Sequence, residues 1–173
     1  KIAILASIAF GKRIDVNNVY CEGISKVSPI DISYAAELGY KIKLIAMSQV
    51  NEEGRLDIRV HPALASKDHP LASINGVTNA LTVCGDAVGE VNFSGPGAGE
   101  LPTASAVVGD VLAIVREINL TSNILPSMRC KHTENADIIP MEDTVNSYYV
   151  RIHSNDTPGV IGNMGLADRK STR

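Results

Sequence analysis

Two alternating runs of apolar and polar residues dominate the first half of the chain. They span residues 40–48 and 55–62, and a polar turn, Asn51 to Gly54, separates them. Alternation with a period of two is typical of a strand that buries one face. The runs therefore predict an antiparallel hairpin with a buried apolar face, Ile42, Leu44, Ala46, Leu56, Ile58 and Val60, and an open polar face, Lys41, Lys43, Asp57, Arg59 and His61.

Two helices are predicted in the first quarter of the chain. The opening stretch, KIAILASIAFG, is apolar at almost every position, which predicts a helix that is buried on all sides. The stretch SPIDISYAAELG carries both start and stop signals. Ser28 is placed as N-cap, Pro29 takes the first helical position and Asp31 completes a capping box. Gly39 then marks the end of this helix.

Further hairpin and helix signals follow in the second half. DHPLASI predicts one short helical turn, and TNALTVCGDAVGEVNFSG predicts a second hairpin that turns near Gly85 and Asp86. From Thr103 to Ile118 apolar residues recur at helical spacing, which predicts an amphipathic helix. Gly109 inside this helix costs about 1 kcal/mol relative to alanine, which suggests close packing at that point.

The periodicity is lost between residues 119 and 143, which we interpret as a linker. TVNSYYVRI, residues 144–152, predicts a strand, and HSNDTPGVIGNMG predicts a turn that leads into a helix. Helices thus interleave with antiparallel hairpins instead of regular βαβ units. This order predicts the α+β class, with a mixed, largely antiparallel sheet and helices packed on one face, as one domain over residues 1–118.

The composition excludes several classes of function. The chain of 173 residues has 16 basic and 19 acidic side chains, a net charge of −3 and no Trp, so it offers neither a broad basic surface nor a stacking platform for nucleic acid. No apolar run is long enough to span a membrane. Cys21, Cys84 and Cys130 form no CxxC pair, which favours reduced thiols in a cytoplasmic protein.

A glycine cluster, GPGAG, precedes the predicted helix at Thr103. Its glycines, Gly95, Gly97 and Gly99, have the spacing GxGxG, which is neither the GxGxxG dinucleotide fingerprint nor a P-loop. Bare backbone amides at a helix N-terminus can face an anion or let a cofactor approach, and they can equally form a tight turn. The spacing leaves both interpretations open. The histidines lack metal-ligand spacing, so we expect no metal site.

Taken together, these stretches resemble homoserine dehydrogenase. The resemblance runs in order from Lys1 to Glu117 through KIAILASIAFG, EGISKVSPIDISYAAELGYKIKLIA, DIRVHPALASKDHPLASINGVTNA and GPGAGELPTASAVVGD. It corresponds to the catalytic and dimerisation region of that family. The later stretch YYVRIHSNDTPGVIGNMG resembles the opening strand and turn of an ACT domain, so residues 144–173 are expected to be a truncated ACT-like segment.

The resemblance implies NAD- or NADP-dependent interconversion of L-homoserine and L-aspartate 4-semialdehyde by a homodimer. It assigns to Lys1 the exchange of the substrate's hydroxyl proton. It places Gly99 against the cofactor, with Gly97 and Ala98 beside it. The family's Rossmann domain and the acidic segment before the catalytic lysine have no counterpart in these residues.

A chain that opens at Lys1, without an initiator Met or a capping residue, is expected to be cut from a longer protein. The final GNMGLADRKSTR suggests the same for the other end, and we expect the isolated chain to be inactive. The alternative is a non-catalytic module for oligomerisation or amino-acid binding, which would need a hairpin-rich sheet but no chemistry.

Overall fold

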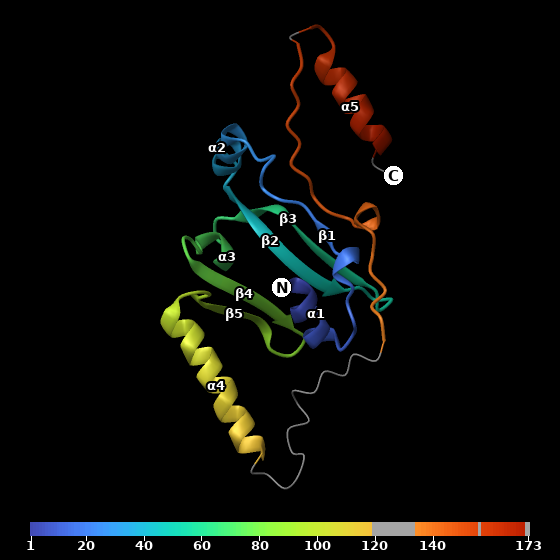
Figure 1. Ribbon diagram of the computed structural model, residues 1–173. Helices are drawn as coiled ribbons and strands as arrows, with labels where there is room; N and C mark the ends of the chain where they lie inside the picture. The colour runs from blue at the N-terminus through green and yellow to red at the C-terminus, as the bar shows by residue number, and fades with distance from the viewer. Residues whose placement is uncertain (119–133, 156, 172–173) are drawn as a thin grey trace.

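One long hairpin organises the fold in the computed structural model, which describes residues 1–118, 134–155 and 157–171. The elements in chain order are α1 (Ile2–Phe10), the 3₁₀ turn η1 (Val16–Asn18), β1 (Tyr20–Cys21), α2 (Pro29–Glu37), β2 (Tyr40–Val50), β3 (Leu56–Ser66), α3 (Pro70–Ser73), β4 (Thr78–Gly85), β5 (Gly89–Pro96), α4 (Glu100–Ile118), the 3₁₀ turn η3 (Met141–Asp143) and α5 (Val160–Ser171). Figure 1 shows the two hairpins beside each other, with α4 and α5 projecting from opposite ends.

Both predicted hairpins are confirmed. Strands β2 and β3 pair antiparallel over their whole length, from Tyr40 opposite Ser66 to Val50 opposite Leu56. Strand β1 adds to β3 in parallel, which gives a three-stranded sheet of order β1-β3-β2. Strands β4 and β5 form a separate two-stranded antiparallel sheet that closes at Gly85 and Gly89. The strands are therefore mixed and largely antiparallel, as predicted, but they form two small sheets.

The predicted capping box of α2 is also confirmed. The Ser28 hydroxyl accepts a hydrogen bond from the Asp31 backbone N–H at 3.4 Å, and the Asp31 carboxylate accepts one from the Ser28 N–H at 3.0 Å. Each bond satisfies a backbone donor that the helix itself cannot pair. Gly39 follows the last turn with φ of 86°, a left-handed conformation that other residues rarely adopt.

Helix α1 forms where predicted, but its predicted burial on all sides is wrong within this chain. Helices α1, α2 and α3 all contact β2, and Ala6 of α1 is buried in that contact. Ile4 and Ile8 are 67% and 66% exposed. One face of α1 packs on the hairpin, and the rest of its apolar surface remains uncovered by the described residues.

Helix α4 differs from its prediction in three ways. It begins at Glu100 rather than Thr103, and none of its described side chains is buried. A Cβ atom at Gly109 would meet nothing within 4 Å, so the close packing expected there is absent. Figure 1 shows the helix projecting away from both sheets. It therefore does not anchor the glycine loop to the core. None of the described helices is long and apolar enough to cross a membrane.

The polar face of the long hairpin was expected to be open, but its β3 residues are buried. Asp57 and Arg59 are only 6% and 4% exposed, and they form an ion pair of 3.2 Å. The Arg59 guanidinium also donates to the Thr144 hydroxyl at 2.9 Å and to the Asn146 side-chain oxygen at 2.6 Å. The prediction of a single buried face is wrong here, because a distant segment covers the polar side.

That segment, residues 134–151, is called the strap below. Its backbone forms parallel bridges from Asn135 to Arg13 and from Ile138 to Leu56. Residues 144–152 form no strand, so the strand predicted there is wrong. A strand needs a neighbour for its backbone groups, and no described strand pairs with this segment. Of the predicted linker, residues 134–143 lie on the sheet, while 119–133 lie outside the described residues.

The strap is held at its far end by the cap of α2. Arg151 donates to the Asp31 carboxylate at 2.6 Å, and the Tyr149 hydroxyl donates to the same carboxylate at 3.1 Å. The Ser28 hydroxyl and the Arg151 guanidinium hold the pKa of Asp31 well below its usual range. One carboxylate thus joins helix α2 to a segment more than a hundred residues away.

We predict that Asp57→Asn lowers the free energy of unfolding of the chain by about 3–5 kcal/mol, because it leaves the Arg59 charge buried without its counter-ion. Urea unfolding followed by circular dichroism measures the change. Asp137→Asn is the matched control, since Asp137 pairs with Arg55 at the same 3.2 Å but with side chains 67% and 34% exposed. We expect it to cost less than about 1 kcal/mol. Equal losses in the two variants would contradict the structure.

We also predict a specific acid sensitivity. A carboxylate whose pKa is lower in the folded state stabilises the fold above its unfolded pKa, and this stabilisation is lost as the pH falls below about 4. Asp31→Asn should be less stable than the parent chain at neutral pH and should lose less stability between about pH 5 and pH 2. Urea midpoints across this range measure it, with Asp68→Asn, at an exposed carboxylate, as control. Parallel profiles for the parent chain and Asp31→Asn would exclude this role of Asp31.

Candidate functional site

Two hollows flank the long hairpin. One, of about 980 Å³, lies between α1, β2 and the second hairpin, and is called the glycine-loop hollow. The other, of about 900 Å³, lies between the sheet and the strap, and is called the strap hollow. Because side chains alternate across a strand, β2 and β3 can line both at once. Leu44, Ala46 and Val60 line the first, and Met47, Arg59 and His61 line the second.

The glycine-loop hollow brings together two of the features singled out in the sequence. Lys1, at the N-terminus of α1, lines it together with residues 95–97 at the end of β5. These residues lie almost a hundred positions apart, and the packing of α1 against β2 and β3 brings them to one cavity. Gly99 does not line the cavity but follows two residues later, with φ of 125°. It thus lies at the bend between the loop and helix α4.

The two lysines of this hollow differ in their surroundings. Lys43 of β2 donates hydrogen bonds to the Ile74 carbonyl and, at 3.2 Å, to the Asn75 side-chain oxygen, so its ammonium is held against the wall. Lys1 is exposed, and no described residue pairs with its ammonium. A lysine with three uncommitted donors beside an apolar wall can bind an anionic or carbonyl group, or exchange a proton with a bound hydroxyl.

The glycine loop itself leaves backbone exposed beside this lysine. Gly95 and Gly97 carry no side chain that would narrow the cavity, and Gly99 adopts a conformation in which any other residue would be strained. The loop leads directly into the first turn of α4, where the N–H groups of Glu100 and Leu101 have no partners within the helix. Pro102 has no N–H, and the Thr103 N–H donates to the Gly99 carbonyl at 3.1 Å. Such a loop lets a planar or anionic ligand approach the backbone closely.

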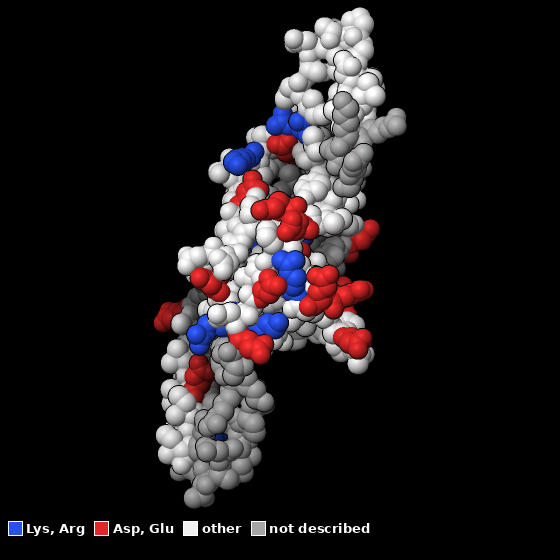
Figure 2. All heavy atoms as spheres, turned by 90° about the vertical axis from the view of Figure 1, so that its right-hand side faces the viewer, with Lys and Arg blue, Asp and Glu red and all other residues white. Residues whose placement is uncertain are grey.

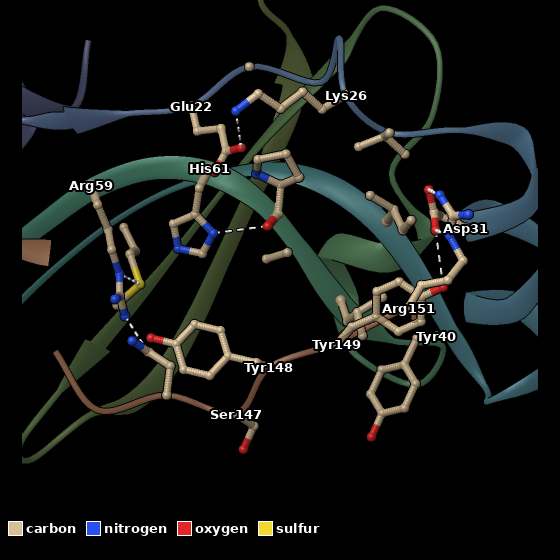
Figure 3. Close-up of a pocket in the computed structure, with 18 of the residues that line it drawn as sticks. Glu22, Lys26, Asp31, Tyr40, Arg59, His61, Ser147, Tyr148, Tyr149 and Arg151 are labelled. Carbon is tan, nitrogen blue, oxygen red and sulfur yellow. Dashed lines mark hydrogen bonds and ion pairs between the residues drawn. The ribbon is translucent and has the colours of Figure 1, made fainter. Parts of the chain in front are cut away.

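The strap hollow has a different character, because its charged groups are already paired with one another. In Figure 3, Arg59, His61 and Tyr148 gather at one end, and Asp31 and Arg151 at the other. Glu22 and Lys26 form a 3.7 Å pair at its edge. The His61 Nδ1 atom lies 2.9 Å from the Pro62 carbonyl and donates to it. Burial and the Asp31 carboxylate raise the pKa of Tyr149. The contacts of Arg59 and Asp31 with the strap hold it in place.

Sequence reasoning did not identify the residues that make these contacts. Asp31 was recognised only as a helix cap, and Arg59 only as a surface charge. The pairing of Asp31 with Arg151 spans 120 positions, which no local pattern signals. The spacing of Asp57 and Arg59, two residues apart on one face of the strand, was a signal for the buried ion pair. Opposite charges at this spacing can pair along a strand.

The remaining chemistry is limited. The residues that the structure describes contain no group of three His, Cys, Asp or Glu side chains able to hold a metal ion. Cys21 and Cys84 are free thiols, and Cys130 lies outside the described residues. On the face shown in Figure 2, acidic side chains gather over the middle of the molecule, with basic side chains beside them. The glycine-loop hollow is therefore the better candidate for a reaction site.

Comparisons with known proteins agree with the resemblance. The family model described as homoserine dehydrogenase matches residues 1–112. The homoserine dehydrogenase of Synechocystis sp. is 48% identical over 172 residues, which cover 96% of this chain and 40% of that protein. The enzyme of Neisseria gonorrhoeae is 41% identical over 165 residues, covering 94% of this chain and 38% of that protein. The chain thus spans about 40% of the length of these relatives.

Solved structures give the same result. A homoserine dehydrogenase from Thiobacillus denitrificans superposes with a TM-score of 0.86 at 33% identity, covering 99% of this chain and 40% of that one. The enzyme of S. aureus superposes with a TM-score of 0.64 at 41% identity, covering 71% of this chain and 30% of that one. The sequence, the fold and both kinds of relative agree, and the chain belongs to the homoserine dehydrogenase family.

Proposed function

We propose that this chain supplies the substrate side of an NAD- or NADP-dependent homoserine dehydrogenase, which interconverts L-homoserine and L-aspartate 4-semialdehyde. One observation carries the proposal: Lys1 and Gly97 of the glycine loop line the same hollow, and Gly99, which the family resemblance places against the cofactor, follows two residues later. The names of the relatives support the same activity.

Each part of the hollow has a role in this reaction. When bound, the nicotinamide cofactor exchanges a hydride with the substrate carbon that carries the oxygen. As a neutral amine, Lys1 takes the hydroxyl proton during oxidation of homoserine, and as the resulting ammonium it returns that proton during reduction of the aldehyde. No described residue competes for its nitrogen. The bare backbone of the loop, up to Gly99, allows the cofactor to approach. Lys43 stays bound to the Ile74 carbonyl and maintains the opposite wall.

Several further assignments follow from the same proposal. We place the enzyme in the cytoplasm as a homodimer. Exposed apolar side chains on α4, Val107, Val108 and Val111, at 57%, 56% and 52%, support a partner surface there. We also propose the division into residues 1–118, a linker 119–143 and an ACT-like segment 144–173. The turn and helix at Val160–Ser171 support the last of these.

The rival proposal is a module that binds or oligomerises without chemistry. The hairpins and the exposed apolar surface of α4 would serve such a module equally well. It gives no reason, however, for an unpaired lysine beside a glycine loop. The two proposals differ in one measurable property, since only the dehydrogenase depends on Lys1 for turnover.

We predict that a chimera in which this chain replaces the matching part of the Synechocystis enzyme oxidises homoserine, and that Lys1→Gln lowers its kcat by about 10²–10⁴-fold. The substitution removes the proton acceptor but leaves the cofactor's binding groups in place, so the KM for NADP should change much less. Initial rates of NADPH formation measure both. Lys26→Gln, at an exposed lysine of the strap hollow, is the control and should retain the parent kcat.

The isolated chain should show no homoserine-dependent reduction of NAD or NADP above the blank. Its described residues contain no βαβ unit to hold a dinucleotide. Two results would favour the non-catalytic module. One is a folded chimera that binds ligand but does not oxidise homoserine, and the other is a Lys1→Gln chimera that is as active as the parent. Turnover by the isolated chain would contradict the division of roles proposed here.

A further inference from the structure

Asn79 of β4 has an unusual relationship to the glycine loop. In the hairpin register it lies opposite Gly95, and its side chain reaches diagonally to Gly97, where the chain leaves β5. A Cβ atom built at Gly97 would lie only 1.6 Å from the Asn79 Nδ2 atom and 2.4 Å from its Cγ. The Asn79 carboxamide therefore occupies the space that any side chain at position 97 would need.

Gly97 is distinguished by this contact and not by its backbone conformation. Gly97 is not among the glycines with positive φ, so alanine would be conformationally acceptable there. Gly99, with φ of 125°, would be strained by any substitution. A side chain at position 97 would therefore displace the Asn79 amide, which is the far end of an exposed side chain.

The same amide is available to a ligand. Asn79 lines the glycine-loop hollow together with Lys1 and Gly97. No described residue donates a hydrogen bond to its side chain or accepts one from it, and the residue is exposed. An asparagine carboxamide offers two N–H donors and a carbonyl acceptor in one plane. The amide thus lies against Gly97, in a hollow that the unpaired lysine also lines.

We propose that Asn79 is a ligand-binding residue of this site, whose Nδ2 donates a hydrogen bond to a planar oxygen-bearing group of the bound molecule. This inference rests on the proposed function and adds a residue to it. Two groups present in the reaction have this chemistry: the carboxamide of the nicotinamide ring and the carboxylate of the amino-acid substrate. A neutral amide suits either, because it adds a directed donor without a second charge beside Lys1.

The test uses the active chimera and four variants. Asn79→Asp keeps the shape of the side chain but replaces the donor by an acceptor. Asn79→Ala removes the amide, Gly97→Ala displaces it, and a double variant combines the last two. Asn92→Asp is the matched control, because Asn92 lies on β5 of the same hairpin, pairs with Thr82 and Glu90, and does not line the hollow. Circular dichroism and thermal melts confirm that each variant is folded.

Two readouts separate the possible ligand groups. The Kd for NADPH is measured by the fluorescence of the bound nicotinamide without turnover, and the KM for homoserine is measured by initial rates. We expect Asn79→Asp and Asn79→Ala to raise one of these constants by about tenfold or more. A change in the Kd for NADPH assigns the nicotinamide carboxamide. A change in the KM for homoserine assigns the substrate carboxylate, and Asn79→Asp should then be worse than Asn79→Ala because it adds a like charge.

The role of Gly97 gives an independent check. If Gly97→Ala acts by displacing the amide, its effect should resemble that of Asn79→Ala, and the double variant should be no worse than Asn79→Ala alone. Two results in an active chimera would overturn the inference. One is a Kd for NADPH and a KM for homoserine that both stay within twofold of the parent in Asn79→Asp and Asn79→Ala. The other is a double variant in which the effects of Asn79→Ala and Gly97→Ala add. A folded parent chimera that neither turns over nor binds NADPH would overturn the proposed function, and this inference with it.

Discussion

The antiparallel pairing of β2 with β3 is the constraint on which the rest of the structure depends. It joins two strands of eleven residues each, and three helices contact β2 along its length. Its alternation sends Leu44, Ala46 and Val60 to one hollow and Met47, Arg59 and His61 to the other. A slip of β3 by one residue would turn Val60 toward the strap and turn Arg59 and His61 away from it. The register therefore determines both cavities.

The two faces of this hairpin serve different purposes. On one side, polar groups satisfy one another: Arg59 with Asp57, Thr144 and Asn146, and Asp31 with Arg151. A buried charge is costly unless paired in this way, so these contacts hold the strap in one position. On the other side, Lys1 and Asn79 have no described partners. A binding site needs polar groups that are free to contact a ligand, and an exposed backbone that the ligand can approach. Residues that only hold the fold together are instead paired with one another.

Local signals in the sequence predicted the local structure well. The capping box at Ser28 and Asp31, the turn after β4 and the alternation of both hairpins follow from interactions between near neighbours in the chain. The burial of Asp57 and Arg59 did not follow, because the strap that covers them is more than eighty positions away. The exposure of α1 and α4 was not predicted either, because no described segment covers their apolar faces. An apolar pattern indicates that a face can be buried, but it does not show what covers that face. Asn79 escaped notice because its significance depends on the space at Gly97, which no spacing rule encodes.

We place the proposed reaction in the glycine-loop hollow and not in the strap hollow. A crystal structure of the Synechocystis chimera with bound NADPH tests it most directly. We expect the nicotinamide ring to lie in the hollow lined by Lys1, Asn79 and Gly97, within reach of the Lys1 side chain. A nicotinamide ring found between the sheet and the strap, beside Arg59 and His61, would contradict it.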